Sequence, residues 1–235
     1  MYPGLRYPQR LDWSSPINAV LDGNSIAAGT NASSSAYYIN ALVAAMAPMS
    51  GAVPFSNIAI GGQTTRQMDG LDGGSSADVD AAWVSGKTNI LVAWELTNHI
   101  ISTGCSGEEA AQVMADYIAH RLAVHPWRVI IMTALPRYKL GIGGLSVDQL
   151  NANLDDANAL VKSHWRTWGA SGVCDVRAVG GPFDFPDYQW DTFERSKTKE
   201  LWSIGDAAGT HEHLSDAGFE ALAPLLSRTL NRLIA

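Results

Sequence analysis

The sequence predicts an α/β protein, a three-layer α/β/α sandwich built around a five-stranded parallel sheet. Short apolar runs alternate along the chain with longer segments of helical period, a pattern typical of βαβ units whose sheet is covered on both faces. The 235 residues are enough for one such domain with a continuous core. We therefore expect one domain over residues 17–235, preceded by an N-terminal extension over residues 1–16.

The composition excludes several classes of function. No apolar run is long enough to cross a bilayer, so we expect no membrane span. The net charge of −7 and the scattered Lys and Arg residues argue against nucleic-acid binding, which needs a basic surface. Cys105 and Cys174 are too far apart in sequence for a CxxC metal motif or a disulfide framework. No cofactor is expected, and the first residues lack the pattern of a secretory signal.

The five expected strands are short apolar runs, and they cover residues 17–21, 53–60, 89–94, 129–134 and 173–179. Sites in open parallel sheets lie beyond the carboxyl ends of the strands. The segments that directly follow these strands are therefore the places to search for functional residues.

Three long helices are expected, each with one apolar stripe that can pack on the sheet. The first covers residues 108–124, with the stripe Ala110, Met114, Tyr117, Ile118 and Leu122. The second begins at a capping box formed by Ser146 and Gln149, and its stripe is Leu150, Leu154, Ala157, Val161 and Trp165. The last covers residues 216–233, with the stripe Phe219, Leu222, Leu226, Leu230 and Leu233.

A serine follows the first expected strand, in the segment Asp22-Gly-Asn-Ser25. Serine is a weak nucleophile unless a base and donors for the developing oxyanion lie beside it. Ser25 on a glycine-containing turn at a strand end could be such a nucleophile. The alternative is that Asn24 and Ser25 only cap the following turn.

Two further polar segments follow the next two strands. After the second comes Gly61-Gly62-Gln-Thr64, where glycines allow a backbone N–H to approach a substrate; the alternative is a strand-to-helix turn with a threonine cap. After the third comes Asn98, whose side-chain amide could donate into the same cleft. The alternative for Asn98 is a loop asparagine with local partners.

A histidine stands immediately before the last expected helix, in His213-Leu-Ser-Asp-Ala-Gly-Phe. Its side chain can act as a general base because the ordinary pKa of imidazole is near neutrality. The alternative is a metal site, in which His211 and His213 would need a third ligand such as His99 or Asp206. The catalytic interpretation is favoured because the HxH pattern is common and unspecific.

The four segments occur in an order that resembles the SGNH hydrolases, the family of GDSL-like esterases and lipases. The matching residues are Ser25, Gly62, Asn98 and His213, and the segment that begins at His213 is the most specific match. The resemblance extends from about residue 17 to the C-terminus. It implies a flavodoxin-like parallel sheet and a serine esterase that acts through an acyl-enzyme.

The resemblance also implies a role for each matching residue. Ser25 would be the nucleophile, and His213 would be the base that takes its proton. The oxyanion would accept hydrogen bonds from the backbone N–H groups of Ser25 and Gly62 and from the side-chain amide of Asn98.

The sequence departs from the family pattern at several positions. Asn24 replaces the aspartate that usually precedes the nucleophile, Leu96 replaces a small residue, and His99 replaces an acid. The latter two changes predict an unusual pocket wall. The triad acid is also missing from its usual place three residues before the histidine, where Thr210 stands.

Three groups could orient the His213 imidazole in place of that acid. The carboxylate of Asp206 is the first, and a backbone acceptor at Thr210 is the second. Glu212 ranks below both, because neighbouring side chains on an extended segment point apart.

The segment over residues 180–190 is rich in aromatic residues and proline, and we expect it to overhang the site. Aromatic faces can stack on sugar rings, which favours removal of O-acetyl groups from a carbohydrate. The alternative for these side chains is packing on the domain or in an oligomer interface. The substrate is thus expected to be a small-molecule or glycan ester. The alternative function is a catalytically degenerate glycan-binding module on the same fold.

Overall fold

Five parallel strands form one sheet in the order β2-β1-β3-β4-β5. They are β1 (Ile17–Gly23), β2 (Phe55–Asn57), β3 (Thr88–Trp94), β4 (Arg128–Met132) and β5 (Gly172–Cys174). This is the strand order of flavodoxin-like sheets. The structure, a computed structural model, describes residues 16–33, 55–71, 73–137, 144–184, 201–202 and 212–234. The N-terminal extension is therefore almost wholly outside the described residues, and the domain division stays a prediction.

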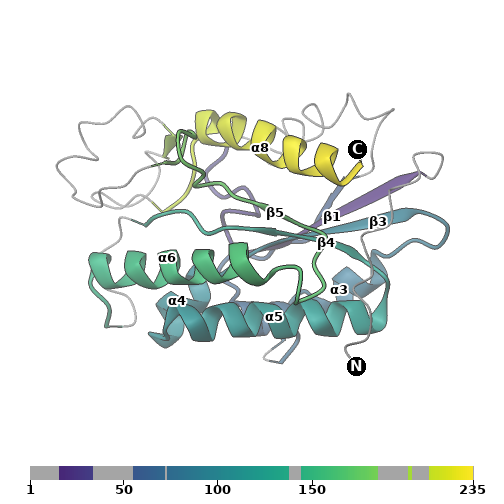
Figure 1. Cartoon of the computed structure of the whole chain (residues 1–235), viewed down its shortest axis with the longest axis horizontal. Coiled ribbons are helices and arrows are strands. Elements are labelled where there is room, and N and C mark those ends of the chain that lie inside the picture. The colour runs from purple at the N-terminus through teal and green to yellow at the C-terminus, as the bar shows by residue number, and fades with distance from the viewer. Residues whose placement is uncertain are drawn as a thin grey trace.

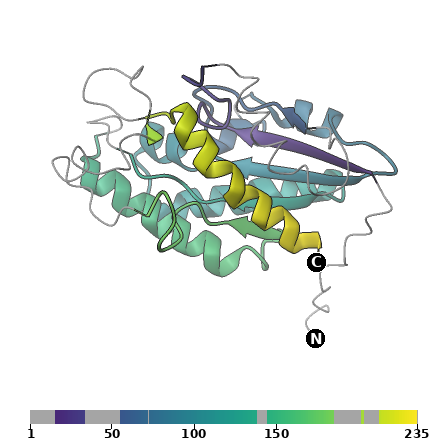
Figure 2. The ribbon, with the colours of Figure 1, turned by 90° about the horizontal axis from the view of Figure 1, so that it is seen from above.

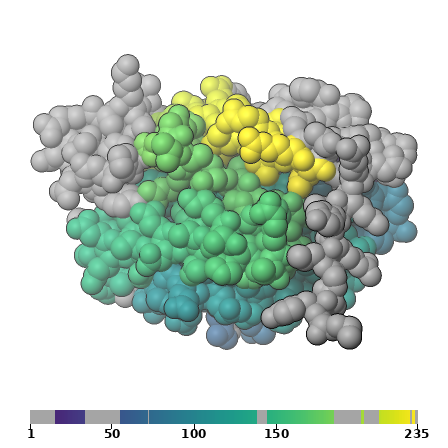
Figure 3. Space-filling view, viewed as in Figure 1, coloured from purple at the N-terminus to yellow at the C-terminus, as the bar shows by residue number. Residues whose placement is uncertain are grey.

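Helices cover both faces of the sheet (Figure 1). Helix α8 (Asp216–Ile234) lies on one face and crosses the strands obliquely (Figure 2). The other face is covered by α4 (Thr97–Thr103), α5 (Gly107–Val124) and α6 (Val147–His164). Two short helices, α2 (Thr65–Met68) and α3 (Ser76–Ala81), precede β3. Both helical layers reach the molecular surface shown in Figure 3, where α8 lies above α6.

The strands divide the core into two layers because successive side chains alternate between the faces of a sheet. One layer joins Leu21 and Val92 to Phe219 and other residues of α8. The other joins Val20, Leu91 and Ala93 to residues of α5 and α6. The predicted three-layer sandwich and its five-stranded parallel sheet are confirmed.

The three long helices agree with the apolar periodicity. In α5, α6 and α8 the predicted stripe residues are buried, apart from the last member of each, which is half-buried. Ser146 and Gln149 form the predicted capping box of α6, with each side chain bonded to the other residue's backbone N–H. Cys105 and Cys174 are both buried free thiols.

Two strands are shorter than the apolar runs that predicted them. The expected strand over residues 173–179 ends at Cys174, because the backbone N–H of Val176 bonds to the Thr133 hydroxyl instead of continuing the ladder. The expected strand over residues 53–60 is assigned only at Phe55–Asn57, yet Ile58 and Ile60 still donate to backbone carbonyls of β1. Both apolar runs therefore overestimate the length of the strand, and their last residues, Ile60 and Val179, are exposed.

In the part of the chain that the structure describes, no helix is both long and apolar enough to span a bilayer.

Candidate active site

Ser25 lies on a turn that directly follows β1. Its neighbour Gly23 lies so close to β3 that a Cβ atom there would be 2.4 Å from the carbonyl oxygen of Trp94. The Asn24 side chain accepts a 2.9 Å hydrogen bond from the backbone N–H of Ile26, which closes the turn around Ser25. Asn24 therefore does cap the turn, as the alternative interpretation held, and the same turn leaves Ser25 half-buried at the sheet edge.

Ser25 and His213 meet although 188 positions separate them in the chain. The distance from Ser25 Oγ to His213 Nε2 is 2.9 Å, which is hydrogen-bond distance. Both side chains are half-buried. A base within reach of a serine hydroxyl is the arrangement that nucleophilic catalysis requires.

The segment that carries His213 is held between residues 201–202 and the start of α8. Leu214 forms an antiparallel bridge with Trp202, and Ser215 donates its backbone N–H to the Leu201 carbonyl over 2.9 Å. A Cβ atom on Gly218 would lie 2.2 Å from that same carbonyl oxygen, so the close approach requires glycine.

Polar contacts among the described residues also join this histidine segment to other parts of the site. The backbone N–H of Ser33, at the end of the nucleophile turn, donates to the Asp216 carboxylate over 2.9 Å. Hydrogen bonding to Ser33 holds the pKa of Asp216 below its ordinary value. The buried Arg137 guanidinium donates to the backbone carbonyl of Glu212, the residue before His213.

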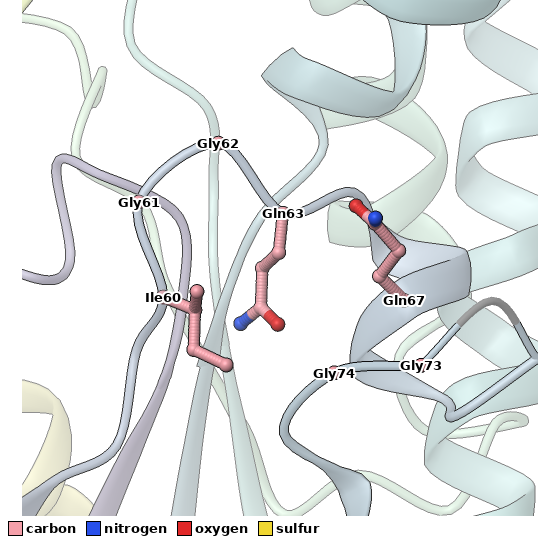
Figure 4. A pocket seen from close by; sticks show the side chains of 7 residues that line it. All are labelled: Ile60, Gly61, Gly62, Gln63, Gln67, Gly73 and Gly74. Carbon is pink, nitrogen blue, oxygen red and sulfur yellow. The ribbon is translucent and has the colours of Figure 1, made fainter.

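The glycine pair after β2 lies beside the nucleophile. A Cβ atom on Gly61 would be 3.9 Å from the Ser25 Cβ, and Gly62 has a φ of +83°, a conformation that favours glycine. The turn borders a cavity of about 430 Å³, lined by Ile60, Gly61, Gly62, Gln63, Gln67, Gly73 and Gly74. Figure 4 shows the Gln63 side chain between Ile60 and Gly74. The lining combines the backbone of four glycines with the side chains of Ile60, Gln63 and Gln67.

Asn98 lies in the first turn of α4, rather than in a loop as the alternative interpretation held. Its side-chain Nδ2 donates to the backbone carbonyl of Gln63 over 3.2 Å, which brings it to the residue after Gly62. An amide nitrogen carries two hydrogens. The bond to Gln63 therefore orients the amide and leaves a second N–H for a substrate oxygen.

The buried carboxylate of Glu95 contacts the segments that carry Ser25, Gly62 and Asn98. Glu95 Oε2 accepts a 2.6 Å bond from the Thr65 hydroxyl, and Oε1 accepts from the backbone N–H groups of Asn98 at 2.5 Å and His99 at 3.3 Å. Asn24 Nδ2 lies 3.5 Å from the same Oε1. Burial raises the pKa of Glu95 above its ordinary value, although each of these hydrogen bonds lowers it.

A second buried carboxylate, Asp22, connects β1 to the cavity wall. It accepts hydrogen bonds from Gln63 at 3.0 Å, Ser75 at 2.6 Å and Tyr117 at 2.7 Å. Burial raises the pKa of Asp22 to about 6. These contacts fix the Gln63 side chain, which also donates to the Gly23 carbonyl over 2.6 Å.

The identity of the group that orients His213 stays a prediction, because Asp206 and Thr210 lie outside the described residues. His211 also lies outside them, so the alternative metal site cannot be assembled from described positions. Among the described residues, no group of three or more His, Cys, Asp or Glu side chains could hold a metal ion. The third suggested ligand, His99, is buried in α4.

Sequence reasoning missed three supporting residues, Glu95, Asp22 and Arg137. The only signal for the two acids was a carboxylate at the end of an otherwise apolar strand, where an unpaired charge would be costly. Nothing in the sequence near Arg137 indicated a contact with the histidine segment.

Comparisons with known proteins support the fold. No protein-family model and no curated protein matches the sequence. Among solved structures, a protein from Slackia heliotrinireducens assigned to the SGNH hydrolases has a TM-score of 0.59 and 19% identity, covering 92% of this chain and 99% of its own. The lipase/acylhydrolase of Enterococcus faecalis has a TM-score of 0.58 and 17% identity, covering 90% and 93%. Est24, a carbohydrate acetylesterase from Sinorhizobium meliloti, has a TM-score of 0.58 and 12% identity, covering 92% and 99%. The chain therefore has the fold of the SGNH hydrolases.

Proposed function

We propose that this protein is a serine esterase that hydrolyses carboxylic esters, with Ser25 as nucleophile and His213 as general base. The observation that carries the proposal is the 2.9 Å distance between Ser25 Oγ and His213 Nε2. It occurs at the carboxyl edge of a parallel sheet, where such folds place their sites. The likeness in fold to known esterases and acylhydrolases supports the same reaction class.

In the first half of the reaction, Ser25 Oγ attacks the ester carbonyl carbon while His213 Nε2 takes the hydroxyl proton. The carbonyl oxygen becomes an oxyanion. It accepts hydrogen bonds from the backbone N–H groups of Ser25 and Gly62 and from the Asn98 amide. His213 then gives its proton to the leaving alcohol, and the acyl group stays on Ser25.

In the second half, a water molecule replaces the alcohol. His213 takes a proton from this water as it attacks the acyl-enzyme, and the same three donors hold the second oxyanion. Collapse of this intermediate returns the proton to Ser25 and releases the carboxylic acid. Asp206 remains our first choice for the group that orients His213, ahead of a backbone acceptor at Thr210 and of Glu212.

We propose an O-acetylated carbohydrate as the substrate. The cavity beside Gly62 has only one aliphatic side chain, Ile60, in a lining otherwise made of glycines and glutamines. The Gln63 amide is already bonded to Asp22, Gly23 and Ser75. Sugar hydroxyls can bond to the glycine backbone and to the Gln67 amide, whereas a long acyl chain gains little from these groups. The likeness in fold to a carbohydrate acetylesterase points the same way. Of the segment over residues 180–190 that we expected to overhang the site, Phe183 is buried in the core, as the alternative of packing on the domain held. The aromatic residues at 185–190 lie outside the described residues.

The alternative, a degenerate glycan-binding module, predicts binding without turnover. The test is acetate release from an O-acetylated oligosaccharide and hydrolysis of p-nitrophenyl acetate by wild type, Ser25→Ala and His213→Ala. We expect kcat to fall at least about 1,000-fold in both variants, because each loses a group that acts directly on the substrate.

Ser56→Ala is a matched control, because Ser56 is an exposed serine in the edge strand β2. This variant should keep wild-type kcat. A fluorophosphonate probe should label wild type at Ser25 and leave Ser25→Ala unlabelled. Equal rates for wild type and Ser25→Ala would contradict the esterase proposal, and binding of the oligosaccharide with no turnover would favour the binding module.

A further inference from the structure

Glu95 connects the parts of the site that would stabilise the oxyanion. Its carboxylate contacts the segment before Ser25 through Asn24, the segment after Gly62 through Thr65, and the first turn of α4 through Asn98. These segments come from the ends of β1, β2 and β3. A single side chain thus bonds to all three segments that carry the proposed oxyanion donors.

The strongest of these contacts are to α4 and Thr65. The backbone N–H groups of Asn98 and His99 are among the first of the helix, which have no partner inside it, and Glu95 Oε1 accepts both. Oε2 accepts the Thr65 hydroxyl at 2.6 Å. Both carboxylate oxygens are therefore used, and the first turn of α4 is tied to α2.

Burying the Glu95 carboxylate costs free energy, which hydrogen-bond donors around it must offset. Only 1% of the Glu95 surface is exposed. A buried carboxylate is tolerated only when donors surround it. The donors here are two backbone N–H groups, a hydroxyl and a side-chain amide, and no ion pair reaches Glu95 in the described part of the chain.

Asn89, near the start of β3, and Glu95, which directly follows β3, can be compared as two buried polar residues. Asn89, at the other end of the same strand, is equally buried and bonds to Asn18, Val84 and Lys87. Those contacts join segments that carry no proposed site residue. Glu95 differs because it accepts a hydrogen bond from the backbone N–H of Asn98, and the side chain of Asn98 is a proposed oxyanion donor.

We propose that Glu95 is a positioning residue for the oxyanion hole, and that it acts by fixing the first turn of α4 so that the Asn98 amide points at the reacting carbonyl. This inference rests on the proposed esterase function. Glu95 does not touch the substrate. It sets the direction of the Asn98 amide, which stabilises the oxyanion only when its N–H points at the developing charge.

The test is a double-mutant cycle between Glu95 and Asn98, measured as kcat and KM for p-nitrophenyl acetate. Glu95→Ala alone should lower kcat about 10- to 100-fold with KM changed less than about threefold, because it weakens an interaction made mainly in the transition state. In the Asn98→Ala background, the same substitution should lower kcat by no more than about threefold. A purely structural role would give the same loss of kcat in both backgrounds, and that result would overturn the inference.

The conservative variant provides a rescue. Glu95→Gln keeps an oxygen for the Asn98 N–H and places an NH₂ group that can donate to the Thr65 hydroxyl, so kcat should stay within about fivefold of wild type. If Glu95→Ala does not fold, Thr65→Val takes its place in the cycle, since it removes the hydroxyl bonded to Oε2. It should lower kcat at least about threefold alone and less than about twofold with Asn98→Ala; equal losses would overturn the inference.

Asn89→Ala is the control for loss of a buried polar cluster on the same strand. It should lower the Tm and leave the kcat of the folded protein within about twofold of wild type. The outcomes also separate the two proposals. If turnover depends on Ser25 but the effects of the Glu95 and Asn98 substitutions are additive, the role of Glu95 is overturned and the esterase proposal stands. If turnover does not depend on Ser25, the esterase proposal itself is overturned.

Discussion

Ser25 and Asn98 lie at the ends of two paired central strands, whereas His213 lies in a short segment before α8. The first region rests on buried carboxylates, Asp22 and Glu95, each surrounded by hydrogen-bond donors. The histidine segment is held by a two-residue bridge and by contacts with Ser33 and Arg137. Ser25 and Asn98 are thus half-buried side chains that directly follow two central strands, whereas the described bridge and backbone contacts join the histidine segment to residues outside the strands.

This difference predicts where substitutions will be most damaging. Changes at the ends of the central strands should strongly affect transition-state stabilisation or the stability of the whole domain. Changes in the residues that hold the histidine segment, with His213 itself kept, should lower kcat moderately and have small effects on stability. The four predictions below test this contrast, from the largest expected effect to the smallest.

Asn98→Ala should lower kcat about 100- to 1,000-fold, because it removes one of three proposed oxyanion donors. KM should change much less, since the donor matters mainly when charge develops on the substrate oxygen. Steady-state kinetics with p-nitrophenyl acetate measure both values. Ser102→Ala is the control, because Ser102 lies one turn further along α4 and its hydroxyl bonds to backbone carbonyls of that helix. A loss below about fivefold in Asn98→Ala would contradict the proposed role.

Asp22→Asn should change how stability depends on pH. The pKa of Asp22 is raised from 3.8 to about 6, so the folded state binds a proton more tightly than the unfolded state does. Its contribution therefore favours folding below about pH 4 and is lost as the pH rises to about 6. Compared with Asp22→Asn, wild type should lose roughly 3 kcal/mol of unfolding free energy across this window.

Urea denaturation at several pH values between about 3.5 and 7 measures this difference. Glu95 has the same sign of shift, but it is present in both proteins and cancels in the comparison. Tyr117→Phe sharpens the test, because it removes a donor that lowers the Asp22 pKa and should move the window to higher pH. Parallel stability profiles for wild type and Asp22→Asn would contradict the prediction.

Arg137→Met should lower kcat about 10-fold, because the segment next to His213 loses the guanidinium that bonds to the Glu212 carbonyl. Methionine keeps most of the apolar volume of the buried stem. Arg177→Met is the matched control, since Arg177 pairs with Asp155 of α6, outside the catalytic contacts described above. Steady-state kinetics of the two variants should therefore differ. A loss of kcat in Arg137→Met as large as that in Asn98→Ala would contradict the contrast, because both regions would then be equally sensitive to substitution.

Asp216→Asn should have the smallest effect. Its pKa is lowered by the bond to Ser33, so its charge stabilises the folded state above the ordinary pKa, and this contribution is lost as the pH falls through the folded value. Because the group is close to solvent, we expect a Tm decrease of at most about 2 °C near pH 7 and a kcat within about threefold of wild type.

Asp148→Asn is the control for this substitution, because Asp148 stands in the first turn of α6 as Asp216 does in α8. Thermal unfolding at about pH 7 and pH 3 measures the effect. The Asp216 difference should shrink at the lower pH. A Tm loss above about 6 °C would mean that the histidine side also supports global stability.

Much of this protein could be predicted from local patterns. The long helices α5, α6 and α8 follow from apolar stripes, and the strands follow from short apolar runs. The short helices α3 and α4 were not predicted, and α2 appeared only as the alternative of a strand-to-helix turn with a threonine cap, because four to seven residues are too few to show a period. They form where caps and tertiary contacts hold them, as Thr64 does at the start of α2.

By itself the sequence determined the order of strands and long helices and marked Ser25, Gly62, Asn98 and His213 as candidates, because each stands at a predictable boundary of an element. Only the tertiary structure decided that Ser25 meets His213 and that Glu95 ties together three strand ends. The reason is physical. Periodicity and capping act over a few residues, whereas these contacts join positions up to 188 apart and exist only when the folded sheet brings its carboxyl ends together.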